Sequence, residues 1–180
     1  MSGFLFAFLA SIVVGIGARD QALVATLSER QGLRPAVLVL AMLSACASAA
    51  AAIWAGVQVT PMLVPAARTM LVAMVLAVAA LELLVIRPLK APAEPTESLF
   101  AFGAVLLAQQ LTDASRFVLF ALAAASQFPA ATALGGAIGG SVTVLAGWML
   151  AGELRQWPLT MVRRGLGLVL LALAAWLAFG

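Results

Sequence analysis

The feature that most limits the folds open to this chain is a series of apolar segments, each about as long as a membrane-spanning helix. Crossing the hydrocarbon core of a bilayer takes roughly 20 apolar residues in a helix. The 180 residues are 64% hydrophobic and only 9% charged, whereas a soluble domain carries about 25% charged residues. We therefore predict an all-α integral membrane protein that lies almost entirely in the lipid bilayer.

Polar or proline-containing stretches separate the predicted transmembrane helices. Six helices are expected, near residues 3–27, 36–57, 69–86, 99–123, 129–151 and 164–179. The most polar separator, "RPLKAPAEPTES", divides the chain into two halves of three helices. We therefore predict a first repeat at 1–87, a polar cytoplasmic linker at 88–98 and a second repeat at 99–180.

The distribution of basic residues predicts how the helices cross the membrane. The loops after the first, third and fifth helices hold seven basic residues, whereas the opposite side holds only Arg68. The seven are Arg30, Arg34, Arg87, Lys90, Arg155, Arg163 and Arg164. Because loops rich in Lys and Arg stay in the cytoplasm, both termini are expected outside. With three helices each, the two halves cross in opposite directions and form an inverted repeat.

The first predicted helix carries two adjacent charges, Arg19 and Asp20, shortly after Gly15 and Gly17. At the membrane centre the two charges would cost roughly 5–7 kcal/mol, and the large apolar residues of the helix return only roughly 4–7 kcal/mol. The charges are therefore expected to face a neighbouring helix or a water-filled cavity rather than lipid. The glycines permit a break in the helix or the close approach of another backbone.

The fourth predicted helix has a similar interruption in the stretch "QQLTDASR". Its polar residues are Gln109, Gln110, Thr112, Asp113, Ser115 and Arg116. Interrupted helices at corresponding positions of two repeats mark the binding site of many transporters, near the membrane midplane. We therefore predict that both interruptions form one polar site for a small ion or polar solute.

The four charges of these two helices sum to zero, which favours ion pairing. We predict the pairs Arg19–Asp113 and Arg116–Asp20 between the two repeats. Such pairs could also do no more than lock the helices together, without any substrate. Glu82 lies near the end of the third predicted helix, where we expect it to reach the interface and to have a structural role.

The stretch "LGGAIGGSVTVLAG" in the fifth predicted helix is rich in small residues. Gly135 with Gly139, and Gly136 with Gly140, have the spacing that allows two helices to pack closely. We predict a packing role for these glycines rather than contact with a substrate.

The chain resembles the Gdt-type cation exchangers, a family that includes Golgi and chloroplast Ca²⁺/Mn²⁺ transporters with many bacterial relatives. Its members consist of two inverted three-helix repeats, each opening with Glu-x-Gly-Asp-Lys/Arg-Ser/Thr and usually a following Gln. In the first half, Gly17, Arg19 and Gln21 match this pattern. The family's Glu, Asp and Ser/Thr are replaced by Gly15, Ala18 and Asp20.

In the second half of the chain, Asp113 and Ser115 match the family pattern. The family's Glu, Gly, basic residue and Gln are replaced by Gln110, Thr112, Ala114 and Arg116. Asp113 is therefore the one family carboxylate that is kept. The resemblance implies exchange of a divalent cation for protons. It implies Asp113 as metal ligand and proton carrier, Gln110 and Ser115 as further ligands, and Asp20 as a second carboxylate.

Three functions are open at this point. The first is exchange of Mn²⁺ or Ca²⁺ for protons, as the resemblance implies. The second is transport of a small zwitterionic or anionic solute on the same fold, because arginine binds carboxylate and phosphate well. The third is a structural membrane protein whose charges neutralise each other.

Other properties follow from what the composition lacks. The chain has no histidine and no recognisable nucleophile–base arrangement, so we expect no enzyme activity and no cofactor. We expect no nucleic-acid partner, and a homodimer is one option for its assembly. A bacterial inner membrane is expected, since no organelle-targeting extension is visible.

Overall fold

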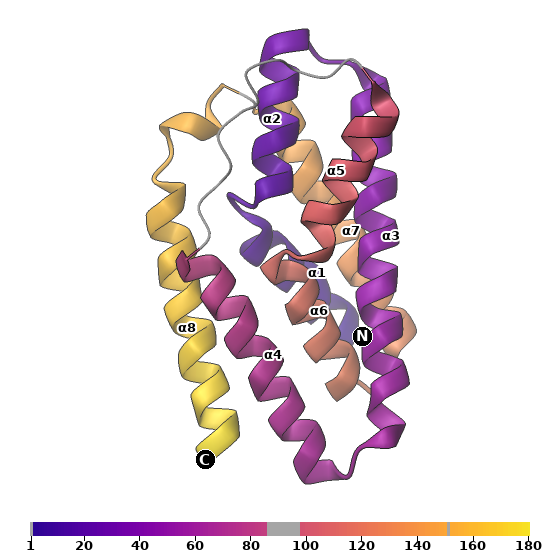
Figure 1. The fold of residues 1–180 in the computed structure, drawn as a ribbon, viewed down its shortest axis with the longest axis vertical. Coiled ribbons are helices and arrows are strands. Elements are labelled where there is room, and N and C mark those ends of the chain that lie inside the picture. Colours follow the sequence, from indigo (N-terminus) through magenta and orange to yellow (C-terminus); the bar gives the residue numbers. More distant parts are fainter. Residues whose placement is uncertain (1, 86–97, 151) are drawn as a thin grey trace.

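The computed structural model describes residues 2–85, 98–150 and 152–180 (Figure 1). Arg87, Lys90 and most of the linker predicted at 88–98 lie outside these residues, as does the side chain of Arg155. The described residues form helices and no strands. The prediction of an all-α fold is therefore confirmed for this part of the chain.

Four long helices and two bent helix pairs make up the fold. The long helices are α3 (Pro35–Val59), α4 (Pro65–Val85), α7 (Pro129–Met149) and α8 (Leu159–Phe179). The bent pairs are α1 (Ser2–Gly15) with α2 (Arg19–Gln31), and α5 (Leu99–Leu111) with α6 (Ala114–Ala125). Two short 3-10 turns, η1 (Thr60–Met62) and η2 (Leu154–Gln156), follow α3 and α7. Among the described residues, four helices are long and apolar enough to cross a membrane, or six if each bent pair is one span.

Prolines mark the beginning of three of the long helices. Pro35, Pro65 and Pro129 lie in the first turns of α3, α4 and α7. Proline is favoured there because an N–H in the first turn has no partner within the helix, and because its fixed φ suits a helix. The predicted helix boundaries lie within four residues of the observed ones, except that α8 begins five residues earlier than predicted, at Leu159. This shift places Arg163 and Arg164 inside a helix rather than in the predicted loop.

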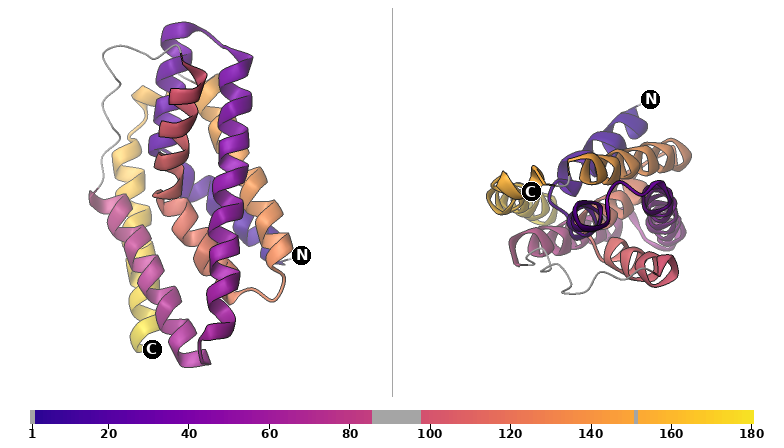
Figure 2. Two further views of the ribbon diagram at one scale, coloured as in Figure 1. Left: turned by 45° about the vertical axis from the view of Figure 1, so that its right-hand side comes forward. Right: turned by 90° about the horizontal axis from the view of Figure 1, so that it is seen from above.

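The helices are arranged around α6, which contacts α1, α3, α4 and α7. Figures 1 and 2 show α4 and α8 side by side along one side of the molecule, with α3 and α7 on the other side. Both bent pairs change direction near the middle of the long axis, and both chain ends lie in the lower half of Figure 1. The side of the membrane that each end faces stays a prediction.

The glycines of α7 lie at close helix contacts. A Cβ on Gly135 would overlap the backbone of α1, and a Cβ on Gly139 would lie 2.6 Å from the carbonyl oxygen of Phe8. On the neighbouring face, a Cβ on Gly136 would lie 2.7 Å from the Leu119 side chain of α6. Close approach of α7 to both bent pairs therefore depends on residues without side chains.

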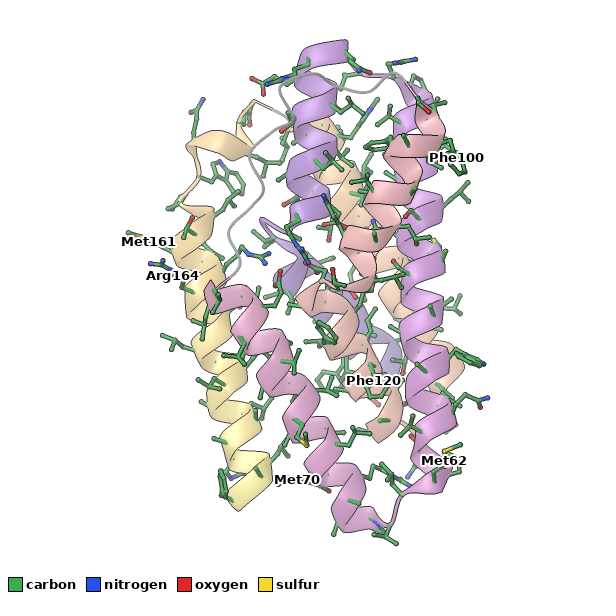
Figure 3. All side chains as sticks on the ribbon, in the orientation of Figure 1. Met62, Met70, Phe100, Phe120, Met161 and Arg164 are labelled. Atoms are coloured by element: carbon green, nitrogen blue, oxygen red, sulfur yellow. The ribbon has the colours of Figure 1, made fainter. Side chains whose placement is uncertain are left out.

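Large apolar side chains cover much of the outer surface. Phe100, Met62 and Met161 are 88%, 79% and 77% exposed, and Figure 3 shows them projecting outward. An apolar exterior of this size is unfavourable in contact with water and favourable in contact with lipid. The surface and the apolar helices are compatible with a multi-pass integral membrane protein.

Candidate functional site

The break in the first bent pair is centred on Gly17. α1 ends at Gly15, α2 begins at Arg19, and the chain bends by 61° between them. Gly17 has a φ of +71°, in the left-handed region that glycine adopts without steric strain. A Cβ on Gly17 would lie 3.0 Å from the Leu159 Cβ of α8. Conformation and space therefore both require glycine at this break.

A glutamine side chain satisfies the backbone that the first break exposes. The N–H of Gly17 donates to Gln21 Oε1 at 2.7 Å. Gln21 Nε2 in turn donates to the carbonyl oxygen of Thr143 in α7, at 3.1 Å. The break is thereby tied to the neighbouring helix α7.

The break in the second bent pair is capped by Asp113. α5 ends at Leu111, α6 begins at Ala114, and the chain bends by 53° between them. Asp113 is the N-cap residue of α6, and its Oδ2 accepts from the Ser115 N–H at 3.0 Å and from the Ser115 hydroxyl at 2.6 Å. A carboxylate is favourable at this position because it meets the unpaired N–H groups and the positive end of the helix dipole.

Arg116 is buried at the centre of a hydrogen-bond network. Its Nε donates to Ser48 Oγ at 2.8 Å, and its Nη2 donates to the Ala45 carbonyl at 3.3 Å, both in α3. Its Nη1 donates to Ser115 Oγ at 3.0 Å. The Ser115 hydroxyl therefore joins the guanidinium to Asp113. Gly140 leaves room for the guanidinium, because a Cβ there would lie 3.3 Å from Nη2.

Gln110 joins the two bent pairs. Its Nε2 donates to Asp20 Oδ2 at 3.1 Å, and its Oε1 accepts from Ser44 Oγ at 2.7 Å. The other carboxylate oxygen of Asp20 accepts from the Gln21 N–H at 2.8 Å. Because Ser48 Oγ also lies 3.4 Å from Gln110 Oε1, the network runs without interruption from Arg116 to Asp20.

A second charged group lies beside this network. Arg19 Nη2 donates to the carbonyl oxygen and to Oγ1 of Thr112, each at 3.0 Å, and so ties α2 to the second break. Arg163 Nη2 lies 2.8 Å from Glu82 Oε2, and Arg19 Nε lies 3.7 Å from Glu82 Oε1. Glu82 thus pairs with arginines of two different helices, α2 and α8.

The two ion pairs predicted between the repeats are wrong. All four residues are described, and no ion pair within 4.0 Å joins Arg19 to Asp113 or Arg116 to Asp20. Arg19 instead binds Thr112 and approaches Glu82. Arg116 reaches the carboxylates only through neutral side chains, because Ser115 stands between it and Asp113.

The expectations for Glu82 and Arg163 are also corrected. Glu82 is 5% exposed and Arg163 is 2% exposed. Glu82 therefore does not extend to the interface, and Arg163 is not a loop residue. A buried charge is tolerated only when it has a partner, and these two residues provide each other with one.

Several polar atoms in this region are buried without a hydrogen-bond partner. Among the acceptors are Asp113 Oδ1 and Gln109 Oε1, and among the donors are Arg163 Nε and Nη1 and Arg19 Nε. Of the predicted site residues, Thr112 is exposed, Gln109 is half-buried, and the Arg19 side chain is 15% exposed. Asp20, Gln110, Asp113, Ser115 and Arg116 are buried. The polar network is therefore closed except near Arg19 and Thr112.

The charges of the region balance. Three carboxylates (Asp20, Glu82, Asp113) and three guanidinium groups (Arg19, Arg116, Arg163) give a formal net charge of zero. Within the described residues, however, no three acidic or Cys side chains are placed so that they could hold one metal ion.

Sequence reasoning missed some of the polar residues that complete the network. Glu82 and Arg163 lie far apart in the sequence, so no local pattern connects them. Ser44 and Ser48 lie in "SACASAAAA", a stretch of small residues without any charge. Their spacing of four residues places both hydroxyls on one helix face, and that spacing was the signal available.

The chain matches no protein-family model, no curated protein and no solved structure. The resemblance to the exchanger family, and the functions that it implies, therefore stay predictions.

Proposed function

We propose that the protein is a secondary transporter whose substrate binds where the two bent helix pairs meet. The observation that carries this proposal is that two apolar helix pairs each break around buried charged residues. Discontinuous helices with half-helix N-termini at the binding site recur among secondary transporters. Charged residues inside a membrane are costly, so they are usually kept for a function.

The packing supports the further proposal that the halves are inverted repeats. α1 packs on α7 as α5 packs on α3, and α2 packs on α7 as α6 packs on α3. The remaining large contacts include α3 with α7 and α4 with α8, which are equivalent positions of the two halves. Exchanging the halves therefore reproduces most of the contact pattern, but the contact of α4 with α6 has no counterpart of similar size between α8 and α2. Rocking of one repeat against the other would expose the site to each side in turn.

Charge balance favours a small polar substrate without net charge. The three arginines stay protonated, and they already neutralise the three carboxylates. A divalent cation would add two positive charges to a buried, neutral region, which is unfavourable in a medium of low dielectric constant. A solute without net charge leaves the balance unchanged.

Exchange of Mn²⁺ or Ca²⁺ for protons is the second candidate. Asp113 Oδ1 and Gln109 Oε1 are buried oxygens without a donor, and hard cations prefer oxygen ligands of this kind. In this candidate Asp113 would bind the cation and carry the proton, as the family resemblance implies.

The test is flux into proteoliposomes, comparing the wild type with Asp113→Asn. One assay follows radiolabelled small polar solutes, and the other follows Mn²⁺ and Ca²⁺ under an imposed pH gradient. Asn is as good an N-cap as Asp, so the variant should fold, and loss of flux would reflect the lost charge. Glu153→Gln, which removes an exposed acid outside the site, is the matched control and should keep full activity.

Each outcome of the flux assay decides between the proposals. Solute flux that disappears in Asp113→Asn supports the first candidate, and metal-ion flux that disappears supports the second. A folded wild-type protein that moves neither class contradicts the transporter proposal and favours a structural role.

A further inference from the structure

We infer that Arg163 and Arg19 bind the carboxylate of a small zwitterionic solute whose ammonium group binds at Asp113. This inference rests on the proposed transport function and names the substrate class together with the residue that recognises each end.

Arg163 is the main evidence for an anion site. Its side chain is 2% exposed, and its described hydrogen bond runs from Nη2 to Glu82. Nε and Nη1 are buried and have no partner. A buried donor that stays unpaired is unfavourable, and a guanidinium presents its donors in a fork that fits a carboxylate. Nε and Nη1 of Arg163 are therefore buried donors without an acceptor. The carboxylate of a bound solute would supply that acceptor.

Arg19 adds a second donor on the accessible side of the site. Its Nε has no hydrogen-bond partner and lies 3.7 Å from the carboxylate of Glu82. Its side chain is partly exposed, so a solute can reach it before reaching the buried Arg163. Both guanidinium groups approach the same Glu82 side chain. The donors of Arg19 and Arg163 therefore lie on opposite oxygens of one carboxylate.

The six charges form two neighbouring groups of opposite sign. Glu82 with Arg19 and Arg163 carries a net charge of +1, because two positive groups face one carboxylate. Asp20 and Asp113 with Arg116 carry a net charge of −1. A molecule with one negative and one positive end matches this division, whereas a simple cation or anion matches only half of it.

The two groups meet at the helix breaks. Arg19 binds Thr112, the residue immediately before Asp113. The side chain of Arg163 lies against the break between α1 and α2. Its Cδ is 3.4 Å from the position that a Cβ on Gly17 would take. Asp113 Oδ1 is a buried carboxylate oxygen without a donor in the group of net negative charge, so an ammonium group can bind it.

The test measures binding to the detergent-purified full chain by thermal unfolding, since a ligand that binds the folded state raises the melting temperature. The probes are glycine, alanine and serine, with propionate and ethylamine as analogues of alanine that lack one end. We expect an amino acid to stabilise the wild type more than either analogue does. Arg163→Lys keeps the charge opposite Glu82 but loses the guanidinium fork, and it should weaken binding by about tenfold or more.

Arg164→Gln is the matched control, because Arg164 neighbours Arg163 in α8 but is exposed and points away from the bundle in Figure 3. It should bind like the wild type. The variant Glu82→Gln/Arg163→Gln removes both charges of the buried pair, and the partly exposed Arg19 keeps its hydrogen bonds to Thr112, so it should fold without binding. Unchanged binding in Arg163→Lys and in the double variant, or no stabilisation of the wild type by any of the three amino acids, would overturn the inference.

This experiment separates the inference from the transport proposal. Amino-acid binding without flux would leave the carboxylate site standing and contradict transport. Metal-ion flux without amino-acid binding would support transport and contradict the carboxylate site.

Discussion

At the scale of single residues, most of the charged groups of the site are held by neutral partners. Arg116 binds two serines and a carbonyl oxygen, and Asp113 binds one serine. Ion pairing seemed the simplest solution from the sequence, because the charges sum to zero. Hydroxyls intervene because Ser115 and Ser48 lie closer to the guanidinium than any carboxylate does.

Gly17 provides a test of the first break at this scale. Gly17→Ala should lower the free energy of unfolding by about 1–3 kcal/mol, because alanine is strained at positive φ. Its Cβ would also press on Leu159. Thermal unfolding in detergent measures the effect.

Alanine substitutions at two other glycines distinguish backbone strain from steric clash as the cause of destabilisation in Gly17→Ala. Gly165 of α8 has open space around it, so Gly165→Ala should be neutral or slightly stabilising. Gly32 has a φ of +80° and equally open space, so Gly32→Ala reports backbone strain without a clash. A Gly17→Ala variant as stable as Gly165→Ala would show that the break does not need glycine.

At the scale of elements, close helix contacts position the two breaks. α7 contacts both bent pairs, and its glycines allow the approach. This role could be predicted from the small-xxx-small pattern. The partner of each glycine face could not, because spacing alone does not say which helix lies opposite.

The two glycine faces of α7 should respond differently to substitution. In Gly136→Ala the new methyl group meets the flexible side chain of Leu119, which can move. In Gly139→Ala it meets the backbone of α1 at Phe8, which cannot move without shifting the helix. We expect Gly139→Ala to be the more destabilising in thermal unfolding, and the reverse order would argue against the described contact of α1 with α7.

At the scale of the whole molecule, hydropathy and proline positions predicted most of the fold. The six predicted helices correspond to four long helices and two bent pairs, and both interruptions fall where charges stand in apolar segments. The side-chain partners could not be predicted. Glu82 and Arg163 pair across α4 and α8, and that contact depends on how the helices rotate and pack.

Thr112 is exposed, so we predict that solutes and reagents enter the site past this residue. In a Cys46→Ala background, Thr112→Cys should react with a membrane-impermeant thiol reagent added to one side of the membrane only. Ser115→Cys, at a buried position, should react much more slowly and is the control. Equal labelling of Thr112→Cys from both sides would contradict access to the site from one side of the membrane only.

The balance of three carboxylates against three guanidinium groups has an electrical consequence. Moving one elementary charge through a membrane potential of 100 mV takes about 2.3 kcal/mol. A carrier whose mobile region sums to zero does no such work, whether it is empty or holds a zwitterion. Its turnover would be indifferent to voltage, and only the concentrations of solute on the two sides would set the direction of transport.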